Sequence, residues 1–349
     1  MDRETAAGIL AKLPGFKVAV IGDYCLDKYV HVDPALAEIS RETGRTAHQV
    51  TVVRTFPGAA GTVCANLASL GFGEVRCFGV TGDDGDGYEL RRGLRQIGCG
   101  CGGLVLADRL TNTYMKPLDD EMRELDRMDF RTRSPVPEEI QKNLADKLEA
   151  ALEDINAVVV VDQFDSADEG LISRYLLGRL RRMAENRPEK LFFCDSRARP
   201  GDFAGMTVKC NHYEAALSAG LAPDDDNLPG IAGALTEITL KPAYITCGEK
   251  GVIAAGRGGA SLSPAIPAQG PLDIVGAGDA ASGGIVAALC SGAPPAEAAF
   301  FANIVSSVTI KKLGVTGTAS PAEVEAAAVP FTNLRPITLA SMTARHSSV

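Results

Sequence analysis

The sequence predicts an α/β protein with a mostly parallel central sheet, helices on both faces of that sheet, and a small projecting β sheet. Short apolar runs alternate with longer helical stretches over most of the chain, and this alternation is typical of a parallel sheet. Two β-rich segments, at about 30–56 and 108–130, interrupt the alternation and are expected to pair as a small sheet at one edge. Near the C-terminus, a turn with two glycines leads into a run of small apolar residues, which indicates a buried helix.

The composition indicates one large folded unit. Of the 349 residues 46% are hydrophobic, so we expect one domain over residues 1–330 and a polar, disordered tail over 331–349. The net charge of −9 disfavours a nucleic-acid surface. The nine cysteines are scattered and the four histidines lack metal-type spacing, so reduced thiols and no zinc site are expected. Because the chain has no membrane-length apolar run and no signal peptide pattern, we expect a cytoplasmic protein with no membrane partner.

The individual elements follow from local patterns. Runs of β-branched and other apolar residues predict strands, in order, at Lys17–Ile21, Val75–Val80, Ala157–Val161, Leu191–Cys194, Met206–Cys210 and Ala243–Thr246. Stretches of small or periodically apolar residues predict helices at Ala59–Leu70, up to about Ile97, at about 137–153 and 168–186, from His212, at about 229–239, at Ala280–Leu289 and at 294–311. Gly71 is expected to cap the C-terminus of the first of these helices.

The turn Gly276-Ala277-Gly278-Asp279 carries the clearest chemical signal. The two glycines allow a tight turn and leave no side chain in the way of a ligand. A helix that begins there directs free N–H groups outward, and such groups favour a phosphate. Asp279 would repel that phosphate, but it suits a base that takes a proton from an attacking hydroxyl. The alternative is that Asp279 only caps the helix.

A second pair of carboxylates follows the first strand. Asp23 and Asp27 come at its carboxyl end, which is the ligand-binding edge of an open α/β sheet. Each could equally be a turn residue.

Four motifs occur in a fixed order and carry a family resemblance, namely Gly22-Asp23-x-x-Leu26-Asp27, Pro57-Gly58-Ala59-Ala60-Gly61, Asn211-x-x-Glu214 and Asp273-x-x-Gly276-Ala277-Gly278-Asp279. Over about residues 15–328 the chain resembles the ribokinase-like (phosphofructokinase-B type) carbohydrate kinases. Within them it is most similar to the heptose-7-phosphate kinases, which form the kinase half of a bifunctional heptose-biosynthesis protein. Arg127-Met128-Asp129-Phe130, and Phe300–Asn303 through Lys312–Gly314, carry this closer likeness.

The resemblance implies a ribokinase-like fold with a β lid, and ATP-dependent phosphorylation of a hydroxyl on a sugar or sugar phosphate. Asp279 would be the catalytic base on a catalytic loop that includes Gly276, Ala277 and Gly278, and the N–H groups of Ala277, Gly278 and Asp279 would form an anion hole. The residues expected to bind the acceptor are Asp23, Asp27, Gly58 and Thr62, with Lys116 and Arg127 holding a phosphate of the substrate. Solvated lid charges are the alternative for Lys116 and Arg127. The lid would also form a homodimer, because unpaired edge strands favour association.

The same resemblance places the nucleotide and the cations. Asn211 and Glu214 would help to hold Mg²⁺ and the phosphates through water, although a helix capping box explains the pair as well. Thr246, Gly248 and Gly251 match the nucleotide-side turn, and Asn303 and Ser307 would lie near the adenine, unless they are a buried polar pair of one helix. Asp273 and Val275 match the site of a monovalent cation, which would be K⁺.

The sugar pocket departs from the family pattern. Ala59 replaces the second glycine of its motif, and Thr62 replaces an asparagine, so the sugar contact is shorter and lacks an amide. Asp165 stands where the closer relatives carry a lysine, which reverses a charge near the substrate. These changes leave the phosphoryl-transfer residues intact and weaken the case for a phosphorylated heptose.

Other functions fit the sequence less well. Gly276-x-Gly278-x-x-Ala281 matches a dinucleotide fingerprint, but it does not follow a first strand or precede a second strand with an acidic residue. No P-loop motif is present. A nucleoside kinase, or a binding protein without catalysis, remains an alternative, and ATP consumption that depends on added sugar would separate the latter from a sugar kinase.

Overall fold

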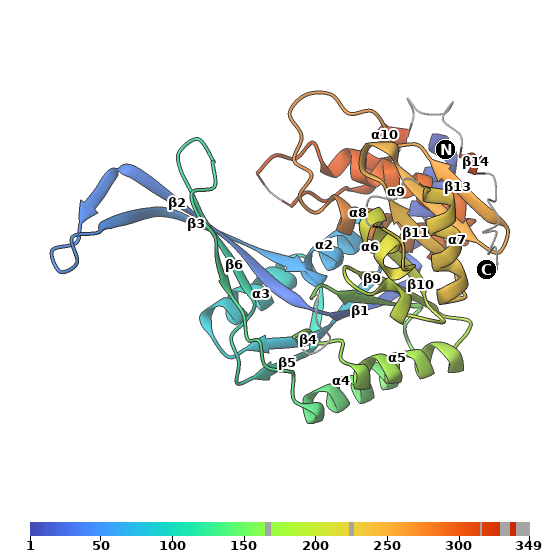
Figure 1. Ribbon diagram of the computed structural model, residues 1–349, viewed down its shortest axis with the longest axis horizontal. Coiled ribbons are helices and arrows are strands. Elements are labelled where there is room, and N and C mark those ends of the chain that lie inside the picture. Colours follow the sequence, from blue (N-terminus) through green and yellow to red (C-terminus); the bar gives the residue numbers. More distant parts are fainter. Residues whose placement is uncertain (165–168, 223–226, 315, 329–335, 340–349) are drawn as a thin grey trace, which may run out of the picture.

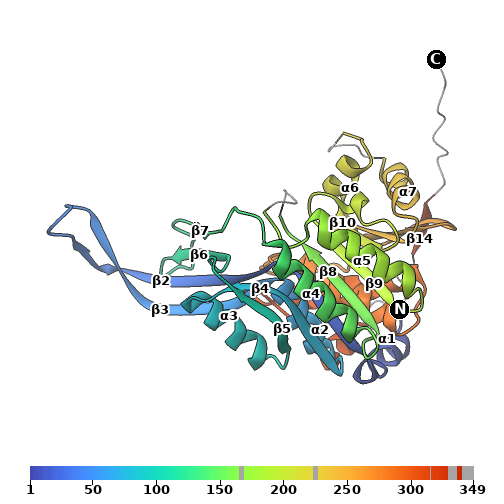
Figure 2. The same cartoon turned by 90° about the horizontal axis from the view of Figure 1, so that it is seen from below.

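The computed structural model describes residues 1–164, 169–222, 227–314, 316–328 and 336–339. It has an α/β body and a second, smaller sheet that projects from it as a long ribbon (Figure 1). The view from below shows the same ribbon running out past α3 (Gly85–Gln96), away from the rest of the body (Figure 2). The predicted fold class is confirmed in both parts.

The central sheet has ten strands among the described residues, in the order β14-β13-β12-β11-β10-β9-β8-β1-β4-β5. Its strands are β1 (Lys17–Gly22), β4 (Glu74–Gly82), β5 (Gly100–Ala107), β8 (Ala157–Asp162), β9 (Leu191–Ser196), β10 (Thr207–Asn211), β11 (Ala243–Thr246), β12 (Val252–Gly256), β13 (Gly259–Ser263) and β14 (Ile337–Leu339). The pairings from β5 through β11 are parallel, and those from β11 to β14 are antiparallel. The sheet is therefore mostly parallel with one antiparallel end.

Helices cover both faces of this sheet, and each face has its own apolar core. One core includes side chains of α1 (Arg3–Leu10), α2 (Ala60–Leu70), α3, α8 (Ala277–Cys290), α9 (Pro295–Thr309) and α10 (Pro321–Ala328). The other includes side chains of α4 (Glu138–Ala151), α5 (Arg174–Asn186), α6 (His212–Ser218) and α7 (Leu228–Thr239). Strand β8 is buried along its whole length because both of its faces are covered, which explains its continuous run of valines.

The projecting sheet has the order β3-β2-β6-β7. Its strands are β2 (Tyr24–Ile39), β3 (Thr46–Ala59), β6 (Thr113–Leu118) and β7 (Met128–Phe130). Strands β2 and β3 pair antiparallel from Tyr24↔Ala59 to Ile39↔Thr46, so their bases reach the body and their tips lie far from it (Figure 1). Residues 104–107, just before the second predicted β-rich segment, belong to β5 of the central sheet.

Several boundaries differ from those expected. Helix α8 begins at Ala277 rather than Ala280, and α5 begins at Arg174 rather than near 168. Most of the tail predicted to be disordered lies outside the described residues, but Ile337–Leu339 within it forms β14 against β13. No helix of the described residues is both long and apolar enough to cross a membrane.

Candidate active site

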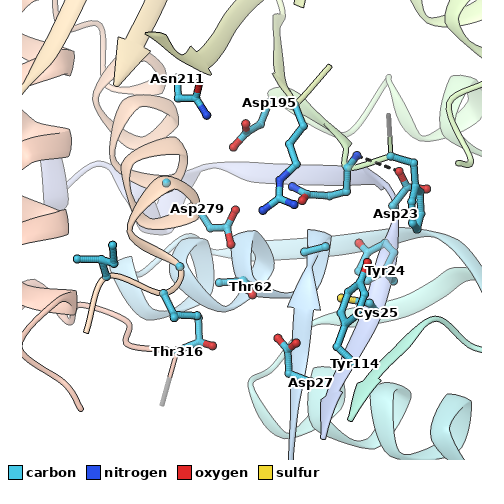
Figure 3. Close-up of a pocket in the computed structure, with 18 of the residues that line it drawn as sticks. Asp23, Tyr24, Cys25, Asp27, Thr62, Tyr114, Asp195, Asn211, Asp279 and Thr316 are labelled. Atoms are coloured by element: carbon cyan, nitrogen blue, oxygen red, sulfur yellow. Dashed lines mark hydrogen bonds between the residues drawn. The ribbon is translucent and has the colours of Figure 1, made fainter. Parts of the chain in front are cut away.

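A pocket of about 450 Å³ lies where the carboxyl ends of the parallel strands meet the base of the projecting sheet and the start of α8. It brings together most of the predicted site residues, namely Asp23, Asp27, Thr62, Lys116, Arg127, Asn211, Glu214, Thr246, Val275, Gly276, Gly278 and Asp279. Its lining also includes residues that the sequence did not single out, among them Tyr24, Tyr114, Asp195, Arg197, Lys209 and Thr316. Asp27 and Asp279 point into the same space from opposite walls (Figure 3).

The turn before α8 has the conformation that its glycines permit. Gly276 has a φ of 79°, a left-handed value that favours glycine, and a Cβ there would lie 2.5 Å from Thr316 Cγ2. Gly276 occupies the N-cap position without any side-chain capping bond, so Asp279 lies in the first turn of the helix. The alternative that Asp279 is only an N-cap is therefore wrong. The Ala277 N–H donates to the Ile274 carbonyl at 3.1 Å, which leaves the N–H groups of Gly278 and Asp279 as the donors of this turn.

Asp279 has the electrostatics of a general base. Burial, and next the charge of Asp195, raise the pKa of Asp279 to about 7, while Lys209 and Arg197 act to lower it. A base with a pKa near the working pH combines a useful ionised fraction with a useful proton affinity. The position of Asp279 at the positive end of α8 suits a carboxylate that works beside a phosphate.

A buried ion pair supports this loop from below. The Lys209 ammonium donates to both carboxylate oxygens of Asp195, at 2.9 and 3.1 Å, and Ser282 Oγ of α8 donates to Asp195 Oδ2 at 2.6 Å. Burial acts to lower the pKa of Lys209, but the charges of Asp195 and Asp279 outweigh burial and raise it. A Cβ on Gly278 would lie 3.1 Å from Lys209 Nζ, so the ammonium sits directly beside the glycine turn.

The sequence reasoning missed Asp195, Arg197 and Lys209. A usable signal was present, because Asp195 and Arg197 directly follow the apolar run of a predicted strand, and Lys209 interrupts another strand near its carboxyl end. Charged residues at these positions reach the ligand-binding edge of a parallel sheet.

The two carboxylates after β1 have different roles. Asp23 is buried, and its oxygens accept from the backbone N–H groups of Leu171 at 2.7 Å and Gln163 at 3.0 Å, so it orders the neighbouring loops. Burial raises the pKa of Asp23 to about 6. Asp27 is half-buried, and burial raises its pKa against the opposing charges of Lys116 and Arg127.

Gly58 allows the chain to pass close to Asp27. A Cβ at Gly58 would lie 2.5 Å from Asp27 Oδ2 and 2.6 Å from Cys25 Sγ, although Gly58 itself does not line the pocket. Thr62, one turn into α2, lines the pocket and donates from Oγ1 to the Pro57 carbonyl at 3.3 Å.

Two cations of the projecting sheet reach the pocket, each with a partner of its own. Lys116 lies 3.8 Å from Glu124 and over the Tyr29 ring. Arg127 pairs with Asp129 at 2.7 Å and stacks 4.7 Å from the Tyr114 ring centroid. Asp165, the expected charge reversal, lies outside the described residues.

Asn211 and Glu214 form a complete capping box at the start of α6, as the alternative interpretation of this pair proposed. The Glu214 N–H donates to Asn211 Oδ1 at 2.9 Å, and Glu214 Oε2 accepts from the Asn211 N–H at 2.6 Å. Both residues nevertheless line the pocket, and burial raises the pKa of Glu214 to about 6. The cap fixes an amide and a carboxylate at the pocket wall, and both supply the oxygen ligands that Mg²⁺ prefers.

The other residues predicted to bind the nucleotide and the monovalent cation divide into two groups. Thr246 and Val275 line the pocket, and Asp273 Oδ1 accepts from the Val275 N–H at 3.0 Å. Among the described residues, the lining does not include Gly248, Gly251, Asn303, Ser307, Asp273 or Ala277. Asn303 donates to the carbonyls of Ser263 and Pro264, and Ser307 to that of Ile304, so the structure gives both of these α9 side chains partners within the protein.

A pocket at the carboxyl ends of parallel strands, with the N-terminus of α8 in its wall, suits a protein that binds a phosphorylated small molecule. The profile of the "pfkB family carbohydrate kinase" matches residues 16–323, and the chain belongs to this family. It is thus an ATP-dependent carbohydrate kinase with a ribokinase-like fold.

Named relatives support the assignment at the level of sequence. The chain is 31% identical over 326 residues to the bifunctional protein HldE of Halorhodospira halophila, covering 90% of this chain and 64% of that protein. It is 28% identical over 340 residues to HldE of Citrifermentans bemidjiense, covering 93% and 66%. The chain thus spans about two thirds of the length of these relatives.

Solved structures share the fold. Phosphofructokinase-2 from Escherichia coli, in complex with potassium, superimposes with a TM-score of 0.71 at 16% identity, covering 90% of this chain and 98% of that one. Ribokinase from Thermotoga maritima gives a TM-score of 0.66 at 18% identity, covering 89% and 99%.

Proposed function

We propose that this kinase transfers the terminal phosphoryl group of ATP to a hydroxyl of a sugar monophosphate, with Asp279 as the base. The observation that carries the proposal is the position of Asp279: it lies in the first turn of α8, with its pKa raised by burial to about 7, and faces Asp27 across the pocket. One carboxylate beside the phosphate site can then take the proton while the other orients the acceptor.

The chain's own groups suggest how the transfer proceeds. Asp27 accepts a hydrogen bond from the sugar and fixes the reacting hydroxyl, and Asp279 takes the proton of that hydroxyl as it attacks. The free N–H groups of Gly278 and Asp279, with the positive end of α8, hold the oxygens of the transferred group. Arg197 lines the pocket, has no ion pair to any described residue, and stabilises the same charge.

Residues of the pocket and of the neighbouring turn would hold the cations of the reaction. Mg²⁺, when bound, neutralises charge on the ATP phosphates, and Glu214 with Asn211 would hold it through water. For K⁺, the support is the order that Asp273 imposes on the turn, since its two oxygens accept from the N–H groups of Val275 and Gly314. The test is kinase activity in K⁺ against Na⁺ at equal ionic strength, where equal rates would exclude a K⁺ requirement.

The charged side chains of the pocket suggest which class of acceptor the enzyme uses. Lys116 and Arg127 line the same pocket as Asp279 and could exchange their partners Glu124 and Asp129, which are both exposed, for a phosphate dianion. The sequence places the opposing charge of Asp165 near them, and the two cations against it favour a phosphorylated sugar. Because the named relatives are HldE proteins, a heptose 7-phosphate is one candidate.

The projecting sheet would act as a lid and as a dimer contact. Its ribbon exposes large apolar side chains, including Leu36, Ile39, Val50 and Val53, which are 49–65% exposed. A second copy of the chain would cover them. Light scattering at micromolar concentration should give a dimer, and a monomer would rule out this contact without bearing on the kinase activity.

A coupled ADP-release screen over free and phosphorylated sugars tests the function. Sugar-dependent ADP release that is highest with a monophosphate is the expected result. Efficient turnover of a neutral sugar would refute the phosphosugar acceptor and keep the sugar kinase. No sugar-dependent release with any acceptor, while ATP still binds, would support a binding protein without catalysis.

A further inference from the structure

We infer that the protein has a second metal site, separate from the phosphate pocket, in which buried cysteine thiolates bind one zinc-type ion. Three cysteines from different elements meet in the core, namely Cys64 of α2, Cys77 of β4 and Cys99 immediately before β5. Their Sγ atoms all lie within 4.8 Å of one another, and the three residues are at most 5% exposed. Neither the carbohydrate kinase activity nor the Mg²⁺ ligands proposed above involve them.

The spacing matches a tetrahedral metal better than it matches a disulfide. Cys64 Sγ and Cys77 Sγ are 3.7 Å apart. A zinc ion with Zn–S bonds of about 2.3 Å in a tetrahedron requires sulfur atoms about 3.8 Å apart, whereas a disulfide bond is about 2.0 Å long. Two of the sulfurs are therefore already at the separation that a bound ion needs, and the third lies within 4.8 Å of both.

Cys101 supplies the fourth ligand. It follows Cys99 by two residues, lies in β5 and is half-buried. Its Sγ donates weakly to the Cys99 carbonyl at 3.6 Å and is not one of the three mutually close sulfurs, so ligation requires this side chain to turn toward them. Because β5 is the edge strand of the central sheet, Cys101 also gives an ion a short path from solvent.

Positively charged side chains that would stabilise thiolates approach the cysteines from one side, that of α3. Arg91 and Arg95 of α3 act on Cys101 with their positive charges, and such charges offset the negative charge of a metal with three or four thiolates. Three of the nine cysteines gather here although they come from separate elements, and soft thiolate ligands select zinc and similar metals over Mg²⁺. Neutral thiols that pack as small apolar side chains are the competing interpretation.

The proposed metal site would lie directly behind the pocket wall that is expected to bind the acceptor. Cys64 lies two residues after Thr62, and the Tyr24 hydroxyl lies 3.4 Å from Cys64 Sγ. Thr62 and Tyr24 both line the pocket. A metal at these cysteines would join α2, β4 and β5 directly behind that wall.

The test uses the full chain, purified in a phosphine reductant, loaded with Zn²⁺ and dialysed against metal-free buffer. We expect the parent to retain about one zinc per chain. The matched control Cys247→Ser/Cys290→Ser changes two cysteines outside the cluster and should retain the same amount, whereas Cys64→Ser/Cys99→Ser should retain almost none. Parent protein that retains no more zinc than the Cys64→Ser/Cys99→Ser variant would overturn the inference.

A spectroscopic measurement on the parent covers the case in which the double variant fails to fold. X-ray absorption of the zinc-loaded protein should give a shell of sulfur ligands at about 2.3 Å, and Co²⁺ in place of zinc should give a thiolate charge-transfer band. A shell of nitrogen and oxygen ligands at about 2.0 Å would mean that zinc binds elsewhere on the protein, and the cysteine site would be excluded.

Discussion

Replacing Asp279 by asparagine should remove the activity and stabilise the fold. Asparagine has nearly the same size and can still accept hydrogen bonds, but it cannot take a proton at neutral pH. Loss of a positioned base costs about 10²-fold or more in kcat. ATP binding should be retained, because the turn and its free N–H groups do not depend on the carboxylate.

The gain in stability follows from the raised pKa of Asp279. Burial raises that pKa from its ordinary 3.8 to about 7. Above pH 7 the folded protein must hold an ionised carboxylate, which costs up to about 4 kcal/mol at ~1.4 kcal/mol per pH unit. Between pH 7 and pH 4 the folded state retains a proton that the unfolded chain has lost. The cost therefore decreases as the pH is lowered, to about 2 kcal/mol at pH 5. Partial contact with solvent makes these figures upper limits.

The experiment compares urea unfolding of the parent and Asp279→Asn at pH 8 and pH 5, with ADP release measured on the same samples. The variant should be more stable than the parent, by a larger margin at pH 8 than at pH 5. The matched control Asp83→Asn removes an exposed carboxylate outside the pocket and should show no such pH dependence. Full activity of Asp279→Asn would end the assignment of the base, and an equal margin at both pH values would refute the raised pKa.

Three further outcomes are expected. In Lys209→Met, loss of the positive charge near Asp279 should raise the apparent pKa in the acidic limb of the kcat/KM profile by about one pH unit, from a midpoint near pH 7. An unchanged midpoint would contradict the effect of Lys209 on the pKa of Asp279. Lys116→Ala and Arg127→Ala should each raise KM for a phosphosugar about tenfold and leave KM for ATP nearly unchanged. Equal effects on both substrates would refute a contact between these cations and the phosphate of the acceptor. Gly58→Ala would place a Cβ 2.5 Å from the Asp27 carboxylate and 2.6 Å from Cys25 Sγ, so KM for the acceptor should rise and the unfolding free energy should fall. An unchanged KM in the folded variant would mean that the Asp27 carboxylate does not contact the sugar.

The sequence predicted the parts of the fold whose signals are local. The buried strands appear as apolar runs, and the glycine motif at Gly276 is enough by itself to locate the turn before α8. The start of α8 was predicted three residues late, because Ala277 and Gly278 look like turn residues in isolation. Strands β12 and β13 were not predicted, since their short glycine- and serine-containing segments become strands only by pairing along the sheet edge.

The buried Asp195–Lys209 ion pair beside the site could not be predicted from the sequence, for a different reason. Asp195 and Lys209 are 14 residues apart on neighbouring strands, and their pairing depends on the register of β9 with β10. The register brings Lys209 opposite Asp195, and no motif spacing encodes that contact. Asn211 and Glu214 show the converse case, in which a local pattern correctly predicts both a helix cap and two residues of the pocket wall.

The cations Lys209 and Arg197 explain how a half-buried carboxylate at position 279 can still ionise. Burial and Asp195 both favour the protonated form of Asp279, while Lys209 and Arg197 favour the ionised form. Without the two cations, desolvation would keep the carboxyl group protonated at neutral pH, and it could not act as a base. Without Asp195, Lys209 would lose the partner that offsets its burial and would tend to give up its proton. Asp195 therefore has two effects: its own charge raises the pKa of Asp279, and it keeps Lys209 charged beside the turn, where Lys209 and Arg197 oppose that rise.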